Sequence, residues 1–154
     1  QRRSSEVSAG GGATPLPTLV AIGAWLPQSG FTRVLVSVLS RLASTYDIHY
    51  IGMSYKGQPI HEAGFTVYPC NLRGGDVFGA YQGRDVVRER RAEAVLLLND
   101  VWMLKNYMHA LGPVRKELGT RVLAYCPLDG CLPVERRPRG RARRSTVPPR
   151  FPHL

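Results

Sequence analysis

Residues Ala94–Asp100 read Ala-Val-Leu-Leu-Leu-Asn-Asp and decide the fold class of this 154-residue chain. Five apolar residues in succession, with charge before them and a polar pair after them, do not alternate as a half-exposed strand does. Such a run is typical of a strand in a parallel sheet that helices cover on both faces. The pair Asn99-Asp100 then lies at the carboxyl end of the strand, the edge at which open α/β sheets bind ligands.

The rest of the chain repeats this pattern on both sides of that strand. Four more strands are predicted, at Leu19–Leu26, Asp47–Met53, Phe65–Pro69 and Arg121–Tyr125. Helical spacing of apolar residues predicts three helices, at Phe31–Ala43, Phe78–Arg91 and Val101–Leu118. Pro113 is expected to kink the last helix or divide it in two, and the polar segment Ser54–Gly64 is expected to be a loop. This alternation predicts a doubly wound α/β domain, with a mainly parallel sheet and helices on both faces.

Composition separates the two ends of the chain from its middle. Residues 1–17 are rich in Ser, Gly and Ala, and we expect a disordered lead-in. Residues 18–133 carry the α/β pattern, and residues 134–154 form an Arg- and Pro-rich tail that is also expected to be disordered. Of the net charge of +10, +6 falls on residues 135–154 and only +3 on residues 16–134. The nearly balanced middle argues against nucleic acid as a partner of the folded part.

Two interpretations of the tail follow from its abrupt start. It is either a genuine basic tail, or it replaces a native continuation that was lost, for example through a changed reading frame. We favour the second interpretation, because the alternation of strands and helices stops in mid-pattern after the fifth strand.

The three cysteines indicate neither a metal site nor a disulfide framework. Cys70, Cys126 and Cys131 form no CxxC pair and have no His at zinc-like spacing, so we expect no metal ion. An odd number of scattered cysteines suits a reducing cytoplasm, with Cys70 and Cys126 as small buried hydrophobic side chains. No apolar run approaches the ~20 residues that cross a bilayer, so no transmembrane segment is expected.

Two stretches are candidates for contact with a ligand. In the turn Ser29-Gly30-Phe31, glycine permits close backbone approach and the following helix offers free N–H groups to a phosphate. A plain strand-to-helix turn explains Gly30 equally well, and no Gly-x-Gly-x-x-Gly signature is present, so no nicotinamide cofactor is predicted. Asn99 and Asp100 follow the fourth strand, where Asp100 suits an N-cap as well as a ligand contact. Asp129 repeats this position after the fifth strand.

Four segments resemble the amino-terminal domain of GT-B glycosyltransferases, most closely the retaining group 1 enzymes. They are Leu19–Arg33 with the helix that follows, the second strand at 48–53, Leu98-Asn99-Asp100-Val101-Trp102, and Tyr125-Cys126-Pro127-Leu128-Asp129-Gly130. The resemblance covers roughly residues 18–133. It implies a Rossmann-like half of a two-domain enzyme that works without a metal ion. The amino-terminal half of such an enzyme holds a sugar or glycan acceptor, and the carboxyl-terminal half binds a nucleotide-sugar donor through an acidic motif.

The resemblance also implies roles for individual residues. By position, Gly30 and Phe31 would lie near the donor diphosphate, and Asn99, Asp100 and Asp129 would line the acceptor side. A donor domain and its Glu motif are missing from this sequence, so we expect sugar transfer only when a carboxyl-terminal donor domain is present. The catalytic residues stay unassigned. The alternative is a small α/β binding module whose basic tail contacts nucleic acid.

Overall fold

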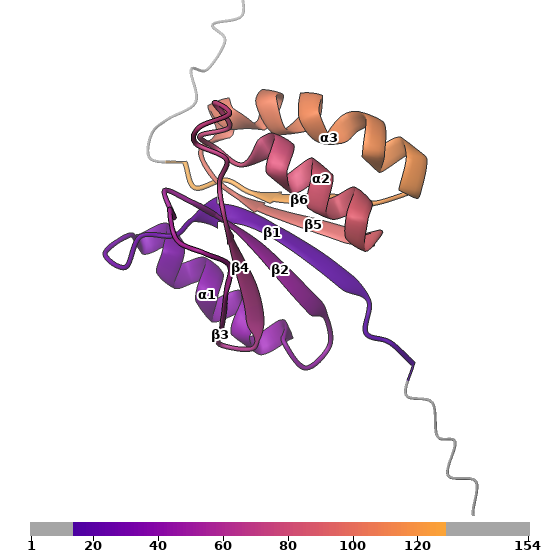
Figure 1. The fold of residues 1–154 in the computed structure, drawn as a ribbon, viewed down its shortest axis with the longest axis horizontal. Helices are drawn as coiled ribbons and strands as arrows, with labels where there is room; N and C mark the ends of the chain where they lie inside the picture. The colour runs from indigo at the N-terminus through magenta and orange to yellow at the C-terminus, as the bar shows by residue number, and fades with distance from the viewer. Residues whose placement is uncertain (1–13, 129–154) are drawn as a thin grey trace, which may run out of the picture.

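The computed structural model of the protein describes residues 14–128 (Figure 1). Six strands are present in this range: β1 (Thr18–Ala24), β2 (Asp47–Met53), β3 (Ile60–Glu62), β4 (Phe65–Pro69), β5 (Ala94–Leu98) and β6 (Arg121–Tyr125). Three α-helices and one 3₁₀ helix connect them: α1 (Gly30–Leu42), α2 (Ala80–Arg90), η1 (Val101–Met103) and α3 (Leu104–Leu118). The predicted tail, residues 134–154, and most of the predicted lead-in lie outside the described residues.

The strands form one mostly parallel sheet in the order β3-β4-β2-β1-β5-β6. β1 lies in the middle and pairs in parallel with β2 on one side and with β5 on the other. Only β3 runs antiparallel, as the outer strand of a hairpin with β4. The prediction of an α/β fold with a mainly parallel sheet is therefore confirmed.

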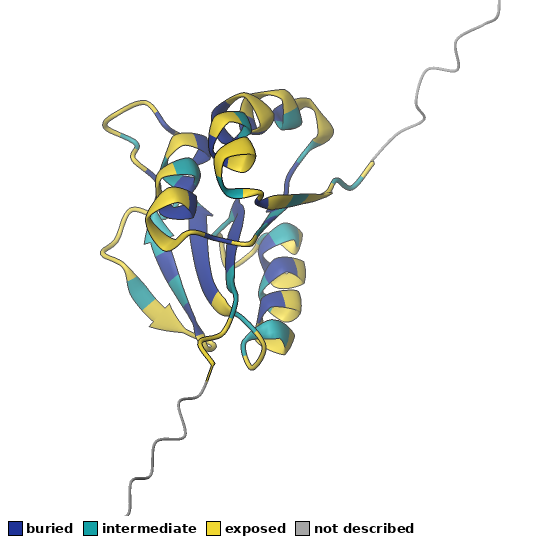
Figure 2. Ribbon diagram, turned by 90° about the vertical axis from the view of Figure 1, so that its right-hand side faces the viewer, coloured by how far each residue is buried: buried dark blue, intermediate teal, exposed yellow. Residues whose placement is uncertain are grey.

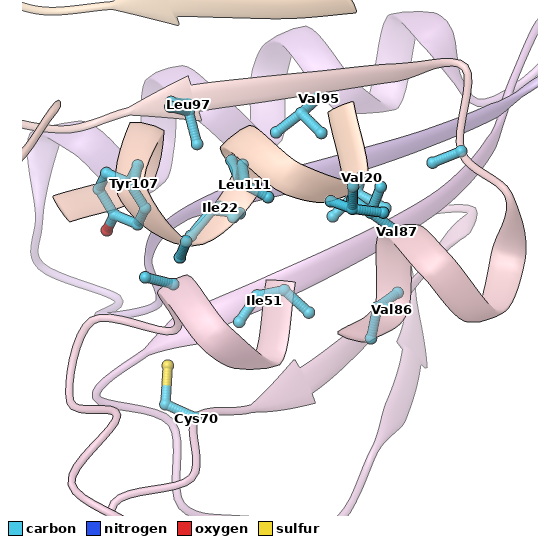
Figure 3. Packing of buried hydrophobic residues seen from close by; sticks show 14 of the residues in the cluster. Val20, Ile22, Ile51, Cys70, Val86, Val87, Val95, Leu97, Tyr107 and Leu111 are labelled. Carbon is cyan, nitrogen blue, oxygen red and sulfur yellow. The ribbon is translucent and has the colours of Figure 1, made fainter. Parts of the chain in front are cut away.

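Two hydrophobic clusters lie on opposite faces of this sheet (Figure 2). On one face, Val20 and Ile22 of β1 pack with side chains of α2 and α3. Figure 3 shows Ile22 and Leu97 of the sheet near Tyr107 and Leu111 of α3. On the other face, alternate residues of the same strand, Leu19 and Ala21, pack with the buried side of α1. Helices thus cover both faces, as the sequence predicts.

β5 is less completely covered than its sequence suggests. Val95, Leu97 and Leu98 are buried, but Ala94 and Leu96 are only half-buried. These two residues point to the α1 side, where the neighbouring strand β6 exposes 67% of Leu123. By contrast, β1 is buried from Leu19 to Gly23, and its neighbour β2 is buried from Ile48 to Gly52. The apolar run of β5 therefore marks a central strand correctly, although α1 covers β1 more fully than β5.

Two details of the predicted elements are wrong. The segment predicted as a loop, Ser54–Gly64, contains the short strand β3, because the two-residue turn Ala63-Gly64 folds it back onto β4. Both turn residues have positive φ angles, 52° and 85°, as a tight hairpin turn requires. The second is the division of the last helix at Pro113, since α3 continues through this residue to Leu118; the alternative, a kink at Pro113, stays a prediction.

The close approach of α2 to β1 gives a test of this packing. A Cβ added at Gly83 of α2 would overlap the Cδ1 atom of buried Ile22, whereas a Cβ at Gly112 of α3 would meet nothing within 4 Å. We expect Gly83→Ala to lower the free energy of unfolding by about 1–2 kcal/mol through overpacking. Gly112→Ala should raise it by roughly 0.5–1 kcal/mol, the helical preference of Ala over Gly. Urea denaturation of both variants measures the difference, and equal shifts would contradict the packing described.

Candidate functional site

The candidate site lies where the direction of the connections reverses. From β1 the chain passes through α1 to β2 on one side, and from β4 it returns through α2, on the opposite face, to β5 on the other side. The loops that follow β1 and β5 therefore leave the sheet toward opposite faces, and a ligand crevice is expected between them. The pairing of Gly23 with Leu98 brings the carboxyl ends of these two strands together. Gly30-Phe31 and Asn99-Asp100 consequently lie at one edge of the sheet.

Thr32 fixes the turn between β1 and α1. Its hydroxyl donates to the carbonyl oxygen of Ala24 at 2.8 Å and accepts from the backbone N–H of Leu26 at 2.9 Å. Gly30 is the first residue of α1, and a Cβ there would meet no atom within 4 Å. Packing within the domain therefore does not require glycine at this position. Phe31 is half-buried and packs against the cluster on the α1 face, so its ring belongs partly to the core.

Trp25 turns inward from the same loop and closes the β1–β2 end of the edge. Its ring makes edge-to-face contacts with Tyr50 (centroids 5.3 Å apart) and with Phe65 (6.5 Å). Its backbone N–H donates to the carbonyl oxygen of Met53 at 2.9 Å. This tryptophan therefore supports the loop.

Asn99 is buried and uses both ends of its amide inside the domain. Its Nδ2 donates to the hydroxyl of Tyr107 at 2.8 Å, and its Oδ1 accepts from the backbone N–H of Asp100 at 2.9 Å. The Tyr107 hydroxyl in turn donates to the carbonyl oxygen of Phe78 at 2.9 Å. Burial raises the pKa of this hydroxyl, so it stays a protonated donor. Asn99 thus ties the end of β5 to α3 and to the β4–α2 loop.

The side chains of Asp100 and Trp102 form no hydrogen bond within this network. Asp100 precedes η1 in an extended conformation and makes no side-chain cap hydrogen bond, so the predicted capping bond is not formed. Trp102 exposes 64% of its surface, and its ring meets Phe78 edge to face with centroids 6.1 Å apart. Of the pair Asn99-Asp100, Asp100 is therefore the member that is open to a ligand, beside an exposed aromatic pair.

Cys70 ends β4 at the same edge and is buried, as predicted, whereas Cys126 is only half-buried. Burial, and secondly the nearby Asp76 carboxylate, raise the pKa of the Cys70 thiol to about 12. The thiol is therefore neutral at physiological pH and acts as a small hydrophobic side chain rather than as a nucleophile.

The structure brings four of the five predicted site residues to one edge. These are Gly30, Phe31, Asn99 and Asp100; Asp129 lies outside the described residues. Sequence reasoning missed Tyr107 and Phe78, which hold Asn99 in place, and Asp76. The exposed aromatic pair had one visible signal, since Trp102 follows directly on the polar end of a buried strand.

Comparison with known proteins adds no assignment: no known protein family matches the chain, and no curated protein is detectably similar to it. Within residues 14–128, no group of three or more His, Cys, Asp or Glu side chains could hold a metal ion. No helix in the same range is long and apolar enough to span a bilayer.

The Tyr107 hydroxyl can be tested through stability. Tyr107→Phe leaves the carbonyl of Phe78 without its donor, and it leaves the amide of Asn99 with only a weak acceptor, the Met53 sulfur at 3.1 Å, in buried surroundings. We expect the free energy of unfolding to fall by about 1–3 kcal/mol. Tyr81→Phe is the matched control, because the Tyr81 side chain is 49% exposed, and it should change stability by no more than about 0.5 kcal/mol. Chemical denaturation measures both variants, and equal effects would rule out the network as a stabilising element.

Cysteine reactivity tests the surroundings of Cys70. At pH 8, iodoacetamide should modify Cys126 faster than Cys70 by roughly tenfold or more, because Cys70 is buried and remains a thiol. Peptide mapping by mass spectrometry resolves the two sites, and the difference should vanish in denaturant. Equal rates of modification of Cys70 and Cys126 in the folded protein would contradict the burial described.

The raised pKa of Cys70 also predicts how stability depends on pH. Since the folded state raises the Cys70 pKa, this group stabilises the fold at neutral pH, and that contribution is lost as the pH rises above about 8.5.

Proposed function

We propose that this chain is the amino-terminal, acceptor-side domain of a GT-B glycosyltransferase of the retaining group 1 type. The order of the parallel strands supports a doubly wound, Rossmann-like arrangement. Counted along the chain, the parallel strands stand third, second, first, fourth and fifth across the sheet, the standard order of nucleotide-binding domains of this kind. The resemblance of the segments around Asn99 and Tyr125 to this family supports the same proposal.

The observation that carries the proposal is the exposed apolar surface at the carboxyl edge. Among residues 14–128, thirteen large hydrophobic side chains are exposed, and eight of them belong to the loops and element ends at this edge: Leu26, Val77, Phe78, Tyr81, Val101, Trp102, Tyr125 and Leu128. Apolar side chains gathered at one edge are typical of a surface that a ligand or another domain covers. In the proposed enzyme, the acceptor sugar and the donor domain cover it together.

The proposal assigns different roles to the two polar residues after β5. Asp100 accepts hydrogen bonds from acceptor hydroxyls beside the Trp102 ring, and Asn99 holds this loop in position through Tyr107. Gly30 leaves the start of α1 accessible to the diphosphate of a donor that a second domain delivers. Catalysis then depends on positioning the acceptor against that donor, and we assign no proton transfer to a residue of this chain. The neutral thiol of Cys70 is compatible with the reducing cytoplasm that we propose as the compartment.

Binding of sugars to the full 154-residue chain tests the proposal. In ¹H–¹⁵N correlation spectra, neutral sugars such as D-glucose, D-mannose and maltose at millimolar concentration should shift the signals of Asp100, Val101 and the Trp102 indole. Asp100→Asn should weaken this binding by roughly tenfold, the loss of a charged hydrogen bond. Asp85→Asn should leave it unchanged, since Asp85 is exposed on α2 and pairs with Arg84.

Two results would argue against this function. Micromolar binding of UDP-glucose or GDP-mannose to the chain alone would place a complete donor site in this domain. Spectra that show no shift at Asp100–Trp102 with any of these sugars would contradict the proposal that these residues bind the acceptor.

A further inference from the structure

A hollow opens at the carboxyl edge, outside the loop that carries Asp100. It lies between the β4–α2 loop and the first half of α3 and has a volume of about 290 Å³. This volume is at the lower end of the range of ligand pockets, which begins at roughly 300 Å³. It therefore suits one monosaccharide rather than an oligosaccharide or a dinucleotide. The side chains that matter for recognition are Asp76, Phe78, Tyr81, Lys105, Asn106 and His109.

Asp76 supplies a carboxylate from a residue that is only 8% exposed. Its Oδ2 accepts the backbone N–H of Gln82 at 2.7 Å, which holds the side chain in place at the start of α2. Its other oxygen has no protein partner among residues 14–128, and no side-chain oxygen or nitrogen in that range is sealed from solvent without a partner. Because Asp76 lines the hollow, this free oxygen is open to it. A held carboxylate with one free oxygen is a strong acceptor for a ligand hydroxyl.

Lys105, Asn106 and His109 line the hollow from α3. Lys105 and His109 are four residues apart and thus lie on one face of the helix. No ion pair joins Lys105 to a carboxylate in the described part of the chain. Its ammonium group is therefore available to an anion, and the Asn106 amide and the His109 ring add hydrogen-bonding groups beside it.

Phe78 joins this hollow to the candidate site. Its ring lines the hollow and also meets Trp102 edge to face. Its carbonyl oxygen is fixed by the hydroxyl of Tyr107. A ligand in the hollow would thus lie next to the exposed aromatic pair, on the same side of the sheet edge as Asp100.

We propose that this hollow binds one sugar unit that carries an anionic substituent, a phosphate or a carboxylate. Sugar hydroxyls donate to the free oxygen of Asp76, and the anionic substituent lies against Lys105 and His109. The inference rests on the proposed function, which it deepens by naming the class of acceptor. Inorganic phosphate alone is a poor occupant, because without a sugar ring it cannot place its charge at Lys105 and separate, uncharged hydroxyl groups at Asp76.

The experiment titrates the full chain with four compounds: D-glucose 6-phosphate, D-glucuronate, D-glucose and inorganic phosphate. Amide signals of Asp76–Tyr81 and Lys105–His109 report on the hollow, and those of Asp100–Trp102 report on the neighbouring site. We expect the two anionic sugars to bind in the hollow at least roughly tenfold more tightly than D-glucose or phosphate. Whichever of the two anionic sugars binds more tightly shows whether the hollow prefers a phosphate or a carboxylate.

Three variants assign this difference to side chains. Lys105→Met should lower the affinity for the preferred anionic sugar by roughly tenfold and leave that for D-glucose within about twofold. Lys116→Met, which removes the same charge from α3 away from the hollow, should change neither. Asp76→Asn keeps an oxygen that accepts the Gln82 N–H. It should lower the affinity for the anionic sugar, whereas the affinity for inorganic phosphate should not fall. Thermal melts of each variant confirm that the fold is kept.

The outcomes separate this inference from the proposed function. Neutral sugars that shift Asp100–Trp102 while no anionic sugar gains affinity in the hollow overturn the inference alone. Anionic sugars that bind in the hollow while Asp100–Trp102 stay silent with every sugar overturn the proposed function alone. Phosphate that binds as tightly as glucose 6-phosphate, or a Lys105→Met variant that behaves like Lys116→Met, overturns the inference. No binding at either position overturns both.

Discussion

The structure depends on one constraint: β1 is buried on both faces and hydrogen-bonded along both edges. Residues Leu19–Gly23 pair with β2 on one side and β5 on the other, and their side chains alternate between two separate hydrophobic clusters. A strand in this position requires helices on both faces, because each set of alternate side chains must be removed from water. The chain meets this requirement by sending α1 to one face and α2 and α3 to the other. The divergence of the loops after β1 and β5 is a direct consequence of that arrangement.

Much of this could be predicted from the sequence, because burial on both faces leaves a local signal. The apolar runs at β1 and β5 and the helical spacing in α1 and α3 are patterns that neighbouring residues carry by themselves. The hairpin strand β3 has only three residues and depends on the positive φ angles of Ala63 and Gly64, which few sequence patterns encode. The partial exposure of Leu96 was equally hidden, since it depends on how far across the sheet α1 reaches. Coverage of a face is a property of the packed domain, whereas the strand itself is a property of the sequence.

At the carboxyl edge, too, some features follow from the sequence and others only from the packing of the domain. That Asn99-Asp100 ends a central strand follows from the sequence, but the different roles of the two residues do not. Asn99 meets Tyr107 and, through it, Phe78, a contact between the β5 end, α3 and the β4–α2 loop that forms only when these elements pack. Asp76 became buried for a related reason, since its carboxylate holds the start of α2 from a loop whose course depends on β4. The sequence predicts that Asn99-Asp100 lies at the carboxyl edge, where the structure has it, but it does not show which side chains face inward.

The inward-facing and outward-facing side chains together fit the binding role that is proposed for this edge. Buried hydrogen bonds from Thr32, Asn99, Tyr107 and Asp76 hold the loops, so the exposed side chains of Trp102 and Phe78 are presented on a fixed support, as a binding surface requires. The polar groups of Thr32, Asn99 and Tyr107 are engaged in these hydrogen bonds. The Cys70 thiol, whose pKa is about 12, is neutral and is no nucleophile. The proposed function leads us to expect buried groups that hold the loops and exposed side chains that contact a ligand. A sugar transfer depends on the acceptor being oriented against a donor, which a second domain would hold. The physical task left to this edge is to hold one reactant still, and its rigid, aromatic and weakly reactive character suits that task.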